Sequence, residues 1–280
     1  MTTRQEILRR TAARLAGLYD AREAHSIALL ALSAWSGLPE SAFLTDPGAT
    51  IDPAGSEPLI ESLAAGRPVQ YVTGRAEFFG RSFAVREGCL IPRPETEELV
   101  AWVLGETAAD AAILDIGTGS GCIAATLAAE RPAAQVTALD VSEQALAIAA
   151  ENCSRLGVHV TLCRGDILQS EQLPVAGPFD AIVSNPPYVP RRDRAAMHRN
   201  VRDYEPAEAL FVPDDDPLCF YRAIARAARR LLVPQGRLYV EIYHELGDAL
   251  CRLLEAEGCT EIRLRNDLFG KPRMICCRMK

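Results

Sequence analysis

Long apolar runs are missing from this sequence, although hydrophobic residues make up 49% of its 280 positions. A membrane-spanning helix needs about 20 consecutive apolar residues, so no such helix is expected. The first residues, 1–6 (MTTRQE), lead into a charged amphipathic segment and lack the apolar stretch of a secretory signal. The composition therefore favours a protein with a sizeable buried core and no membrane contact.

Cysteine pairs are also missing. The nine cysteines are odd in number and stand singly apart from Cys276-Cys277, with no C-x-x-C pair and no His/Cys cluster at zinc spacing. This distribution argues against a disulfide scaffold and predicts no metal site. Free thiols are typical of a reducing compartment, so we expect a cytoplasmic location.

An excess of positive charge is absent as well, since the formal net charge is −7. A protein that grips nucleic acid needs many contacts to phosphates, so no stable nucleic-acid binding is expected. One candidate for a local basic patch lies between positions 191 and 202, with acidic residues interleaved: Arg191, Arg192, Arg194, His198, Arg199 and Arg202. Because charge runs are usually solvated, this segment is either a plain surface loop or a contact for an acidic partner.

The hydrophobic pattern divides the chain into three parts. Apolar residues at three- and four-residue steps between residues 3 and 66 predict a small helical domain, residues 1–67. Residues 68–91 are β-prone and interrupted by glycines, which predicts a hairpin linker. Residues 92–280 alternate between strands and helices, which predicts an α/β domain with a mostly parallel sheet covered on both faces. Strands are expected at 111–116, 134–140, 159–165, 179–184 and 236–242, helices at 120–130, 142–156, 217–232 and 245–257, and a terminal hairpin at 260–267 and 273–279.

One of these strands ends at two consecutive prolines. The buried strand at 179–183 runs into Ser184-Asn185-Pro186-Pro187-Tyr188, and prolines lack the N–H groups that continue a sheet. The chain must therefore leave the sheet at Asn185, at the edge where open α/β sheets place their ligands. The side-chain oxygen of Asn185 and a neighbouring backbone carbonyl can accept both hydrogens of a planar NH2 group. We expect a substrate amide or amino nitrogen to bind Asn185, Pro186, Pro187 and Tyr188, with the ring of Tyr188 on its face and catalytic roles for Asn185, Pro186 and Tyr188.

A glycine-rich turn follows the first strand of the α/β domain, at Gly117-Thr118-Gly119-Ser120-Gly121. Glycines admit positive φ and let a ligand approach the backbone closely. A dinucleotide fingerprint needs its third glycine three positions after the second, where this chain has Cys122, and the lysine of a phosphate-binding P-loop is absent. The loop therefore fits a nucleoside with an amino-acid moiety better than a pyrophosphate, and we assign its five residues to cofactor binding.

Acidic residues end the next two strands at the same sheet edge. Asp140 can accept both hydroxyl hydrogens of a ribose, and Asp166 can accept from an adenine amino group while Ile167 packs against the ring. Asp115 either binds the amino-acid part or braces the glycine loop. These residues predict a nucleoside-binding site without a phosphate-binding loop, next to the NH2-binding site at Asn185. This combination predicts S-adenosylmethionine as cofactor, S-adenosylhomocysteine as its product, and methyl transfer to nitrogen.

Several stretches together resemble one known family. Residues 185–188 (NPPY) resemble the substrate motif of methyltransferases that act on planar NH2 groups. Residues 68–74, 78–80, 90–97 and 113–121 resemble the linker, pre-catalytic and cofactor motifs of the peptide chain release factor N5-glutamine methyltransferases (the PrmC/HemK family), with weaker matches at 204–206 and 241–242. The resemblance runs from about residue 3 to residue 279, and the residues at 243–244 and 268–271 depart from the family pattern.

This resemblance implies a seven-stranded, Rossmann-like methyltransferase domain behind a small N-terminal helical domain that helps to bind the substrate. It implies methylation of the side-chain nitrogen, N5, of the glutamine in the Gly-Gly-Gln loop of class 1 release factors, which tunes translation termination. Carried onto this chain, residues 117–121, Asp140, Asp166, Ile167 and Asn185 bind S-adenosylmethionine, and residues 185–188 bind the glutamine amide. Release factors are then the expected protein partner.

Three alternatives remain open. A glutamine methyltransferase of a ribosomal protein would use the same chemistry on another substrate. A DNA N6-adenine methyltransferase would have to extrude its base and carry a basic recognition face, and the sequence has neither a large insertion nor net positive charge. A nucleoside-binding module without catalysis is disfavoured, because both Asn185 and the glycine loop are intact.

Overall fold

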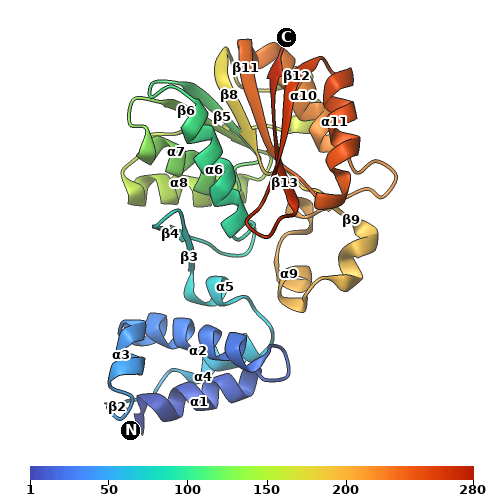
Figure 1. Ribbon diagram of the computed structural model, residues 1–280. Helices are drawn as coiled ribbons and strands as arrows, with labels where there is room; N and C mark the ends of the chain where they lie inside the picture. Colours follow the sequence, from blue (N-terminus) through green and yellow to red (C-terminus); the bar gives the residue numbers. More distant parts are fainter. The chain divides into compact units, whose positions relative to one another are not determined.

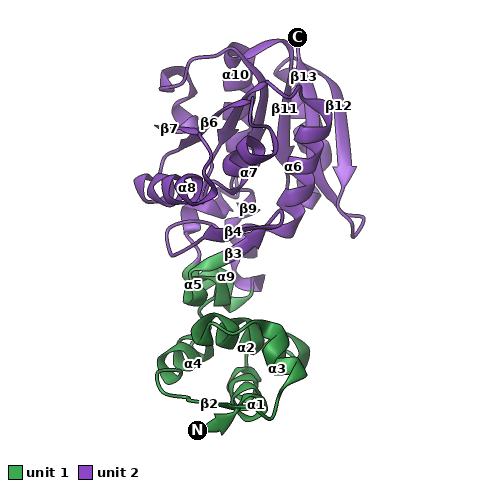
Figure 2. Ribbon diagram, turned by 90° about the vertical axis from the view of Figure 1, so that its left-hand side faces the viewer, with its two compact units in different colours: residues 1–75, 198–204 green, residues 76–197, 205–280 purple.

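The structure is a computed structural model that describes residues 1–280, and it divides into two compact units. The first unit comprises Met1–Arg75 and His198–Tyr204, and the second comprises Ala76–Met197 and Glu205–Lys280 (Figure 2). Seven residues near position 200 therefore group with the first unit, which the order of the sequence does not indicate. The domain limits at 67 and 91 that the sequence pattern suggests stay predictions.

The first unit is built mainly from helices. They are α1 (Arg4–Leu15), α2 (Ala21–Ser36), α3 (Glu40–Thr45), α4 (Glu57–Ala64), α5 (Val69–Thr73) and α9 (Arg199–Tyr204), and β1 (Thr2–Thr3) pairs antiparallel with β2 (Thr50–Ile51). Local signals set the helix ends: Asp20 caps α2 by accepting from two backbone N–H groups, and Gly37 ends it at φ 70°. Residues 69–73 form α5 instead of the predicted β structure, because Pro68 and the left-handed Gly74 bound a single turn that has no partner strand.

Helix α9 is fastened to the first unit by side chains at its two ends. The hydroxyl of Tyr204 donates to the carbonyl of Ala65 at 3.0 Å. The Nε2–H of His198 donates to the carbonyl of Leu18 at 3.1 Å, and its ring stacks on Tyr19 with centroids 5.1 Å apart. These contacts explain why the segment groups with the first unit although the residues before and after it belong to the second.

The second unit is a seven-stranded sheet with helices on both faces (Figure 1). Its strands are β5 (Ala112–Ile116), β6 (Gln135–Asp140), β7 (Thr161–Arg164), β8 (Phe179–Ser184), β11 (Leu232–Glu241), β12 (Cys259–Asn266) and β13 (Pro272–Met279). They lie in the order β12-β13-β11-β8-β5-β6-β7. Neighbouring strands from β11 to β7 are parallel, and β13 runs antiparallel to both β11 and β12. This arrangement confirms the predicted α/β fold class.

Two hydrophobic clusters cover the two faces of the sheet. Its helices are α6 (Pro94–Glu106), α7 (Cys122–Glu130), α8 (Glu143–Leu156), α10 (Cys219–Leu231) and α11 (Gly247–Ala256). Ile113 of β5 belongs to the cluster that contains residues of α6 and α7, and the next residue, Leu114, belongs to the cluster that contains residues of α10 and α11. Alternating side chains of one strand thus serve opposite faces, which explains the continuous apolar runs of the central strands.

Short elements connect this framework. They are the hairpin of β3 (Arg75–Phe78) and β4 (Arg81–Ala84), the parallel pair of β9 (Val189–Pro190) and β10 (Phe211–Val212), and the 3-10 helices η1 (Ile167–Gln172), η2 (Arg191–Ala196), η3 (Ala207–Ala209) and η4 (His244–Leu246). All nine cysteines are free thiols. No helix combines the length and the apolar character that crossing a bilayer would need.

The strand order reverses between β5 and β8. From β5 the chain adds β6 and β7 on one side and then returns to β8 on the other. At such a switch point the carboxyl ends of the strands bound a crevice that binds ligands in open α/β sheets. Ile116 of β5 pairs with Leu139 of β6 and with Ser184 of β8, so this register brings the residues that follow each strand to one edge.

A buried asparagine joins three separate segments of the second unit. Asn152 of α8 is 1% exposed, its Oδ1 accepts from the N–H of Ala84 at 2.6 Å, and its Nδ2 donates to the carbonyls of Ala84 and Ser120. One side chain therefore supplies hydrogen-bond partners to backbone groups at the end of β4 and in the glycine-rich loop. Hydrogen bonds of this kind to buried backbone groups are costly to remove without replacement.

Replacing Asn152 with leucine is expected to reduce the free energy of unfolding by about 3 kcal/mol, because three buried backbone groups lose their partner. Urea denaturation followed by circular dichroism measures this loss. Asn266, an exposed residue at the end of β12, is the matched control, and its replacement by alanine is expected to change stability by less than about 0.5 kcal/mol. Equal stability of the two variants would contradict the bracing role.

Candidate active site

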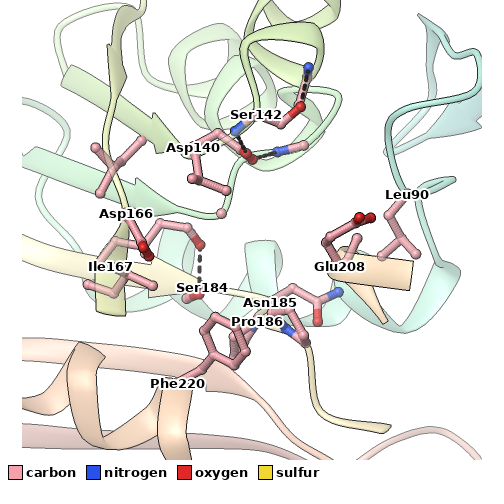
Figure 3. Close-up of a pocket in the computed structure, with 18 of the residues that line it drawn as sticks. Leu90, Asp140, Ser142, Asp166, Ile167, Ser184, Asn185, Pro186, Glu208 and Phe220 are labelled. Atoms are coloured by element: carbon pink, nitrogen blue, oxygen red, sulfur yellow. Dashed lines mark hydrogen bonds between the residues drawn. The ribbon is translucent and has the colours of Figure 1, made fainter. Parts of the chain in front are cut away.

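A cavity of about 600 Å³ lies at the carboxyl edge of the central strands, within the second unit (Figure 3). Its walls come from the ends of β5, β6 and β8, from the start of η1 and from segments at 88–90 and 206–209. Volumes of 300–1,000 Å³ are usual for small-molecule sites. Figure 3 shows the side chains of Asp140, Asp166 and Asn185 around one space, which is where the sequence predicts cofactor and substrate to meet.

The glycine-rich turn opens one wall of this cavity. Gly117 and Gly119 have positive φ, line the cavity, and have no atom within 4 Å of the position that a Cβ would occupy. Gly121 plays a different part, since a Cβ there would lie 2.9 Å from the Cβ of Ala149 in α8. The first two glycines therefore leave room for a ligand, and the third allows the helix that follows to pack closely. Three residues assigned to the cofactor from sequence, Thr118, Ser120 and Gly121, do not line the cavity.

Asp115 braces this turn. It is 0% exposed, and the hydroxyl of Thr118 donates to its Oδ2 at 2.6 Å. Burial raises the pKa of Asp115 to about 7, although the hydrogen bond from the Thr118 hydroxyl lowers it. Of the two roles that the sequence leaves open, the structure favours bracing, because Asp115 does not reach the cavity.

Asp140 ends β6 and presents a carboxylate to the cavity. Its Oδ2 accepts from the N–H of Gly119 at 2.8 Å and its Oδ1 accepts from the N–H of Ser142 at 2.9 Å. Burial raises its pKa, and these backbone donors oppose the rise. A carboxylate has about four acceptor positions, so two remain for hydroxyl groups of a ligand.

Asp166 and Ile167 lie beyond β7 and also line the cavity. The Oδ1 of Asp166 accepts from the N–H of Leu168 at 2.9 Å, which caps η1 and fixes the carboxylate. Ile167 adds an apolar surface, and further apolar residues that the sequence did not predict line the same cavity, among them Leu90 and Phe220. The combination offers a flat heterocycle apolar walls and one acceptor for an amino group.

Asn185, Pro186 and Pro187 form the part of the wall that follows β8. The hydroxyl of Ser184 donates to the carbonyl of Ile116 at 2.7 Å, which locks the end of β8 to that of β5. Asn185 donates from Nδ2 to the hydroxyl of Thr96 at 3.1 Å, and its Oδ1 has no hydrogen-bond partner within the protein. The structure thus brings the acceptor oxygen of Asn185 and the glycine-rich turn to the same cavity.

Tyr188 lies behind this wall and does not line the cavity. Its hydroxyl donates to Oε1 of Glu241 at 3.0 Å, and its ring stacks on Tyr243 with centroids 6.2 Å apart. Burial raises the pKa of Tyr188, and Glu241 adds to the rise. Thr96 and Glu241 are polar neighbours that the sequence analysis did not assign to the site, although both fall in stretches with family resemblance.

The chain matches known proteins along most of its length. Residues 96–203 match the family model described as methyltransferase small domain. A release factor glutamine methyltransferase of Flavobacterium psychrophilum is 42% identical over 93% of this chain and 94% of its own. One of Bacteroides thetaiotaomicron is 47% identical over 78% of each chain.

Solved structures agree on the fold. A methyltransferase from Pyrococcus furiosus covers 72% of this chain and 90% of its own with a TM-score of 0.53 at 18% identity. A ribosomal protein L11 methylase from Lactobacillus delbrueckii covers 73% and 90% with a TM-score of 0.50 at 17% identity. At such identities the likeness concerns the fold alone, whereas the relatives at 42% and 47% identity decide the family. The chain belongs to the release factor glutamine methyltransferases.

Proposed function

We propose that this chain, an enzyme that uses S-adenosylmethionine, methylates the side-chain nitrogen N5 of the glutamine in the Gly-Gly-Gln loop of class 1 peptide chain release factors. The observation that carries the proposal is that Asn185 and Pro186 line the same cavity as Gly119 and Asp140. The proposed binding sites for an NH2 group and for a nucleoside therefore lie in one cavity. Substrates of the family, by the name of its members, are release factors.

The residues of the cavity fit S-adenosylmethionine. Gly117 and Gly119 leave the backbone open to a ligand, and Asp140 and Asp166 supply acceptors that match ribose hydroxyls and an adenine amino group. Cysteine and apolar side chains, among them Ile167, make up much of the remaining wall. When bound, the cofactor supplies a methyl group on a positively charged sulfur.

Asn185 and Pro186 perform the central part of the reaction. The Oδ1 of Asn185 and the carbonyl of Pro186 accept the two N–H hydrogens of the substrate carboxamide and aim its nitrogen lone pair at the donor. Positioning of this kind can supply about 7–11 kcal/mol of barrier reduction. The same two oxygens stabilise the positive charge that develops on nitrogen. No base is needed before attack, because the proton leaves during or after transfer.

Two exposed features support a protein as the substrate. Leu268 and Phe269, at the tip between β12 and β13, are 88% and 85% exposed. The buried carboxylate of Asp267 accepts from the N–H groups of Phe269 and Lys271, which holds this tip in one shape. Glu241 pairs with Met274, so the tip projects from the same sheet edge as Asn185. A specific partner covers about 800 Å² of each protein, so a protein substrate contacts surface outside the cavity as well.

The basic residues of η2, within the second unit, form a second surface for the partner. Arg191, Arg192 and Arg194 are exposed in η2, where they are available to an acidic surface. A DNA substrate is disfavoured because the net charge is −7 and no separate basic domain is present. A ribosomal protein with an accessible glutamine remains the second candidate, since it would offer the same carboxamide.

A substrate panel tests the proposed function. With a labelled donor, we expect label in a class 1 release factor, none in its variant with the loop glutamine changed to alanine, and none in unmethylated DNA. Mass spectrometry of the labelled peptide should place the added methyl group on the side-chain nitrogen of that glutamine. Equal labelling of the alanine variant, or labelling of DNA alone, would overturn the proposal.

A further inference from the structure

A chain of hydrogen bonds runs from Asn185 into the interior of the second unit. Asn185 donates from Nδ2 to Oγ1 of Thr96 at 3.1 Å, and the hydroxyl of Thr96 donates to Oε2 of Glu241 at 2.7 Å. The other carboxylate oxygen of Glu241 accepts from the hydroxyl of Tyr188 at 3.0 Å. Thr96 is 2% exposed and Glu241 is 1% exposed. Neither residue lines the cavity, so neither touches the ligands directly.

The chemistry of these groups fixes the direction of every bond. An ionised carboxylate only accepts hydrogen bonds, so Glu241 takes the single hydroxyl proton of Thr96. The oxygen of Thr96 can then only accept from Asn185, and the only donor on that side chain is its NH2 group. The acceptor oxygen of Asn185 is thereby left on the side away from Thr96, without a partner in the protein.

We propose that Thr96 and Glu241 are positioning residues that hold the Asn185 amide in the orientation that presents its oxygen to the substrate nitrogen. This inference rests on the proposed function and adds how the site selects an NH2 group. If the amide turned over, its own NH2 would meet the substrate NH2, and two donors would face each other. A substrate carboxylate has no hydrogen to donate and is rejected, because two acceptor oxygens would then face each other.

This orientation of the Asn185 amide requires Glu241 to be ionised. Burial raises the pKa of Glu241, and Glu95 of α6 raises it further. Thr96, Tyr188 and Arg273 of β13 oppose the rise, and Tyr221 of α10 donates only to the backbone carbonyl of Glu241. Because the pKa is raised, protonation begins at a higher pH than for an exposed glutamate. Protonated Glu241 can donate to Thr96, which then donates to Asn185, so turnover should be lost as the pH falls through this pKa.

Four variants test the inference in the full-length protein: Thr96→Val, Thr96→Ser, Glu241→Gln and Thr126→Val. Thr96→Val removes the hydroxyl at constant shape and is expected to lower kcat by about 10- to 100-fold. Thr96→Ser keeps the hydroxyl and should restore at least half of the activity. Glu241→Gln is expected to lower kcat similarly and to abolish the acid limb of the pH profile. Thr126→Val is the matched control, because Thr126 is equally buried in α7 and its hydroxyl has no partner.

Two measurements separate this inference from the proposed function. Affinity for S-adenosylhomocysteine, measured by calorimetry, should stay within about twofold in all four variants, because none of the changed side chains lines the cavity. The side-chain NH2 resonance of Asn185, identified by its loss in Asn185→Ala, should shift in Thr96→Val and stay in place in Thr126→Val. An unshifted resonance, or equal kcat for Thr96→Val and Thr126→Val, would overturn the inference while leaving labelling of release factors by the wild type intact. Absence of that labelling would count against the proposed function, and the resonance would still decide the role of Thr96.

Discussion

Replacing Asn185 with alanine is expected to lower kcat for methyl transfer by about a thousandfold, close to the upper end of what loss of one preorganised group costs. The substitution removes the oxygen that we propose to hold one substrate N–H bond, and it also ends the hydrogen bond to Thr96. The substrate carboxamide can then rotate, which turns the lone pair of its nitrogen away from the methyl donor. Single-turnover transfer of label to a release factor measures the chemical step apart from product release.

Donor binding should be nearly intact in this variant. The groups that we propose to hold the nucleoside, among them Asp140 and Gly119, line the cavity and are unchanged in this variant. Calorimetry with S-adenosylhomocysteine should therefore give an affinity within about threefold of the wild type, which amounts to less than 1 kcal/mol. The exposed Asn266→Ala variant is the control and should turn over normally. Near-normal turnover of Asn185→Ala would rule out the holding of the substrate amide by this side chain.

The second large effect is expected from Asp140→Ala, which should weaken donor affinity by about 100-fold or more. Two hydrogen bonds to a charged acceptor are lost, and each contributes about 1.5–3 kcal/mol. The N–H groups of Gly119 and Ser142 also lose their acceptor, which loosens the turn that faces the ligand. Calorimetry with S-adenosylmethionine and with its product measures the change directly.

Asp180→Ala is the matched control for this experiment. Asp180 is exposed near the opposite end of the sheet, where its carboxylate accepts from the N–H of Ala112 at 2.8 Å. Its loss should leave donor affinity unchanged. At saturating donor, Asp140→Ala should retain much of its kcat, because Asn185, the residue that we propose to hold the substrate amide, is unchanged. An affinity within twofold of the wild type would show that Asp140 does not bind the ribose.

The sequence predicts the framework of the site because strand ends follow from local patterns. The apolar runs before Gly117, Asp140 and Asn185 end abruptly, and parallel strands place their carboxyl ends at one edge. The start of β11 was predicted four residues late, at 236, because a register shift lies between Leu232 and Arg237. Irregular pairing of this kind has no periodic signal in the sequence.

The residues behind the cavity wall could not be predicted from the sequence in the same way. Thr96 and Glu241 are 145 positions apart in the sequence, and their contact depends on how α6 packs over β11. Tyr188 illustrates the same limit, since the motif predicts a ring over the substrate and the structure places its hydroxyl on Glu241. Side-chain direction after a turn is decided by tertiary partners, which local propensity does not encode.

The return of residues 198–204 to the first unit has a consequence for dissection of the protein. The backbone passes from one unit to the other at residues 75–76, 197–198 and 204–205, so three peptide connections link them instead of one. A cut after Arg75 would not release two finished pieces: the larger fragment would keep Tyr204 and His198 without Ala65, Leu18 and Tyr19. Anyone who wishes to swap or express these pieces separately must move the helix together with the amino-terminal segment.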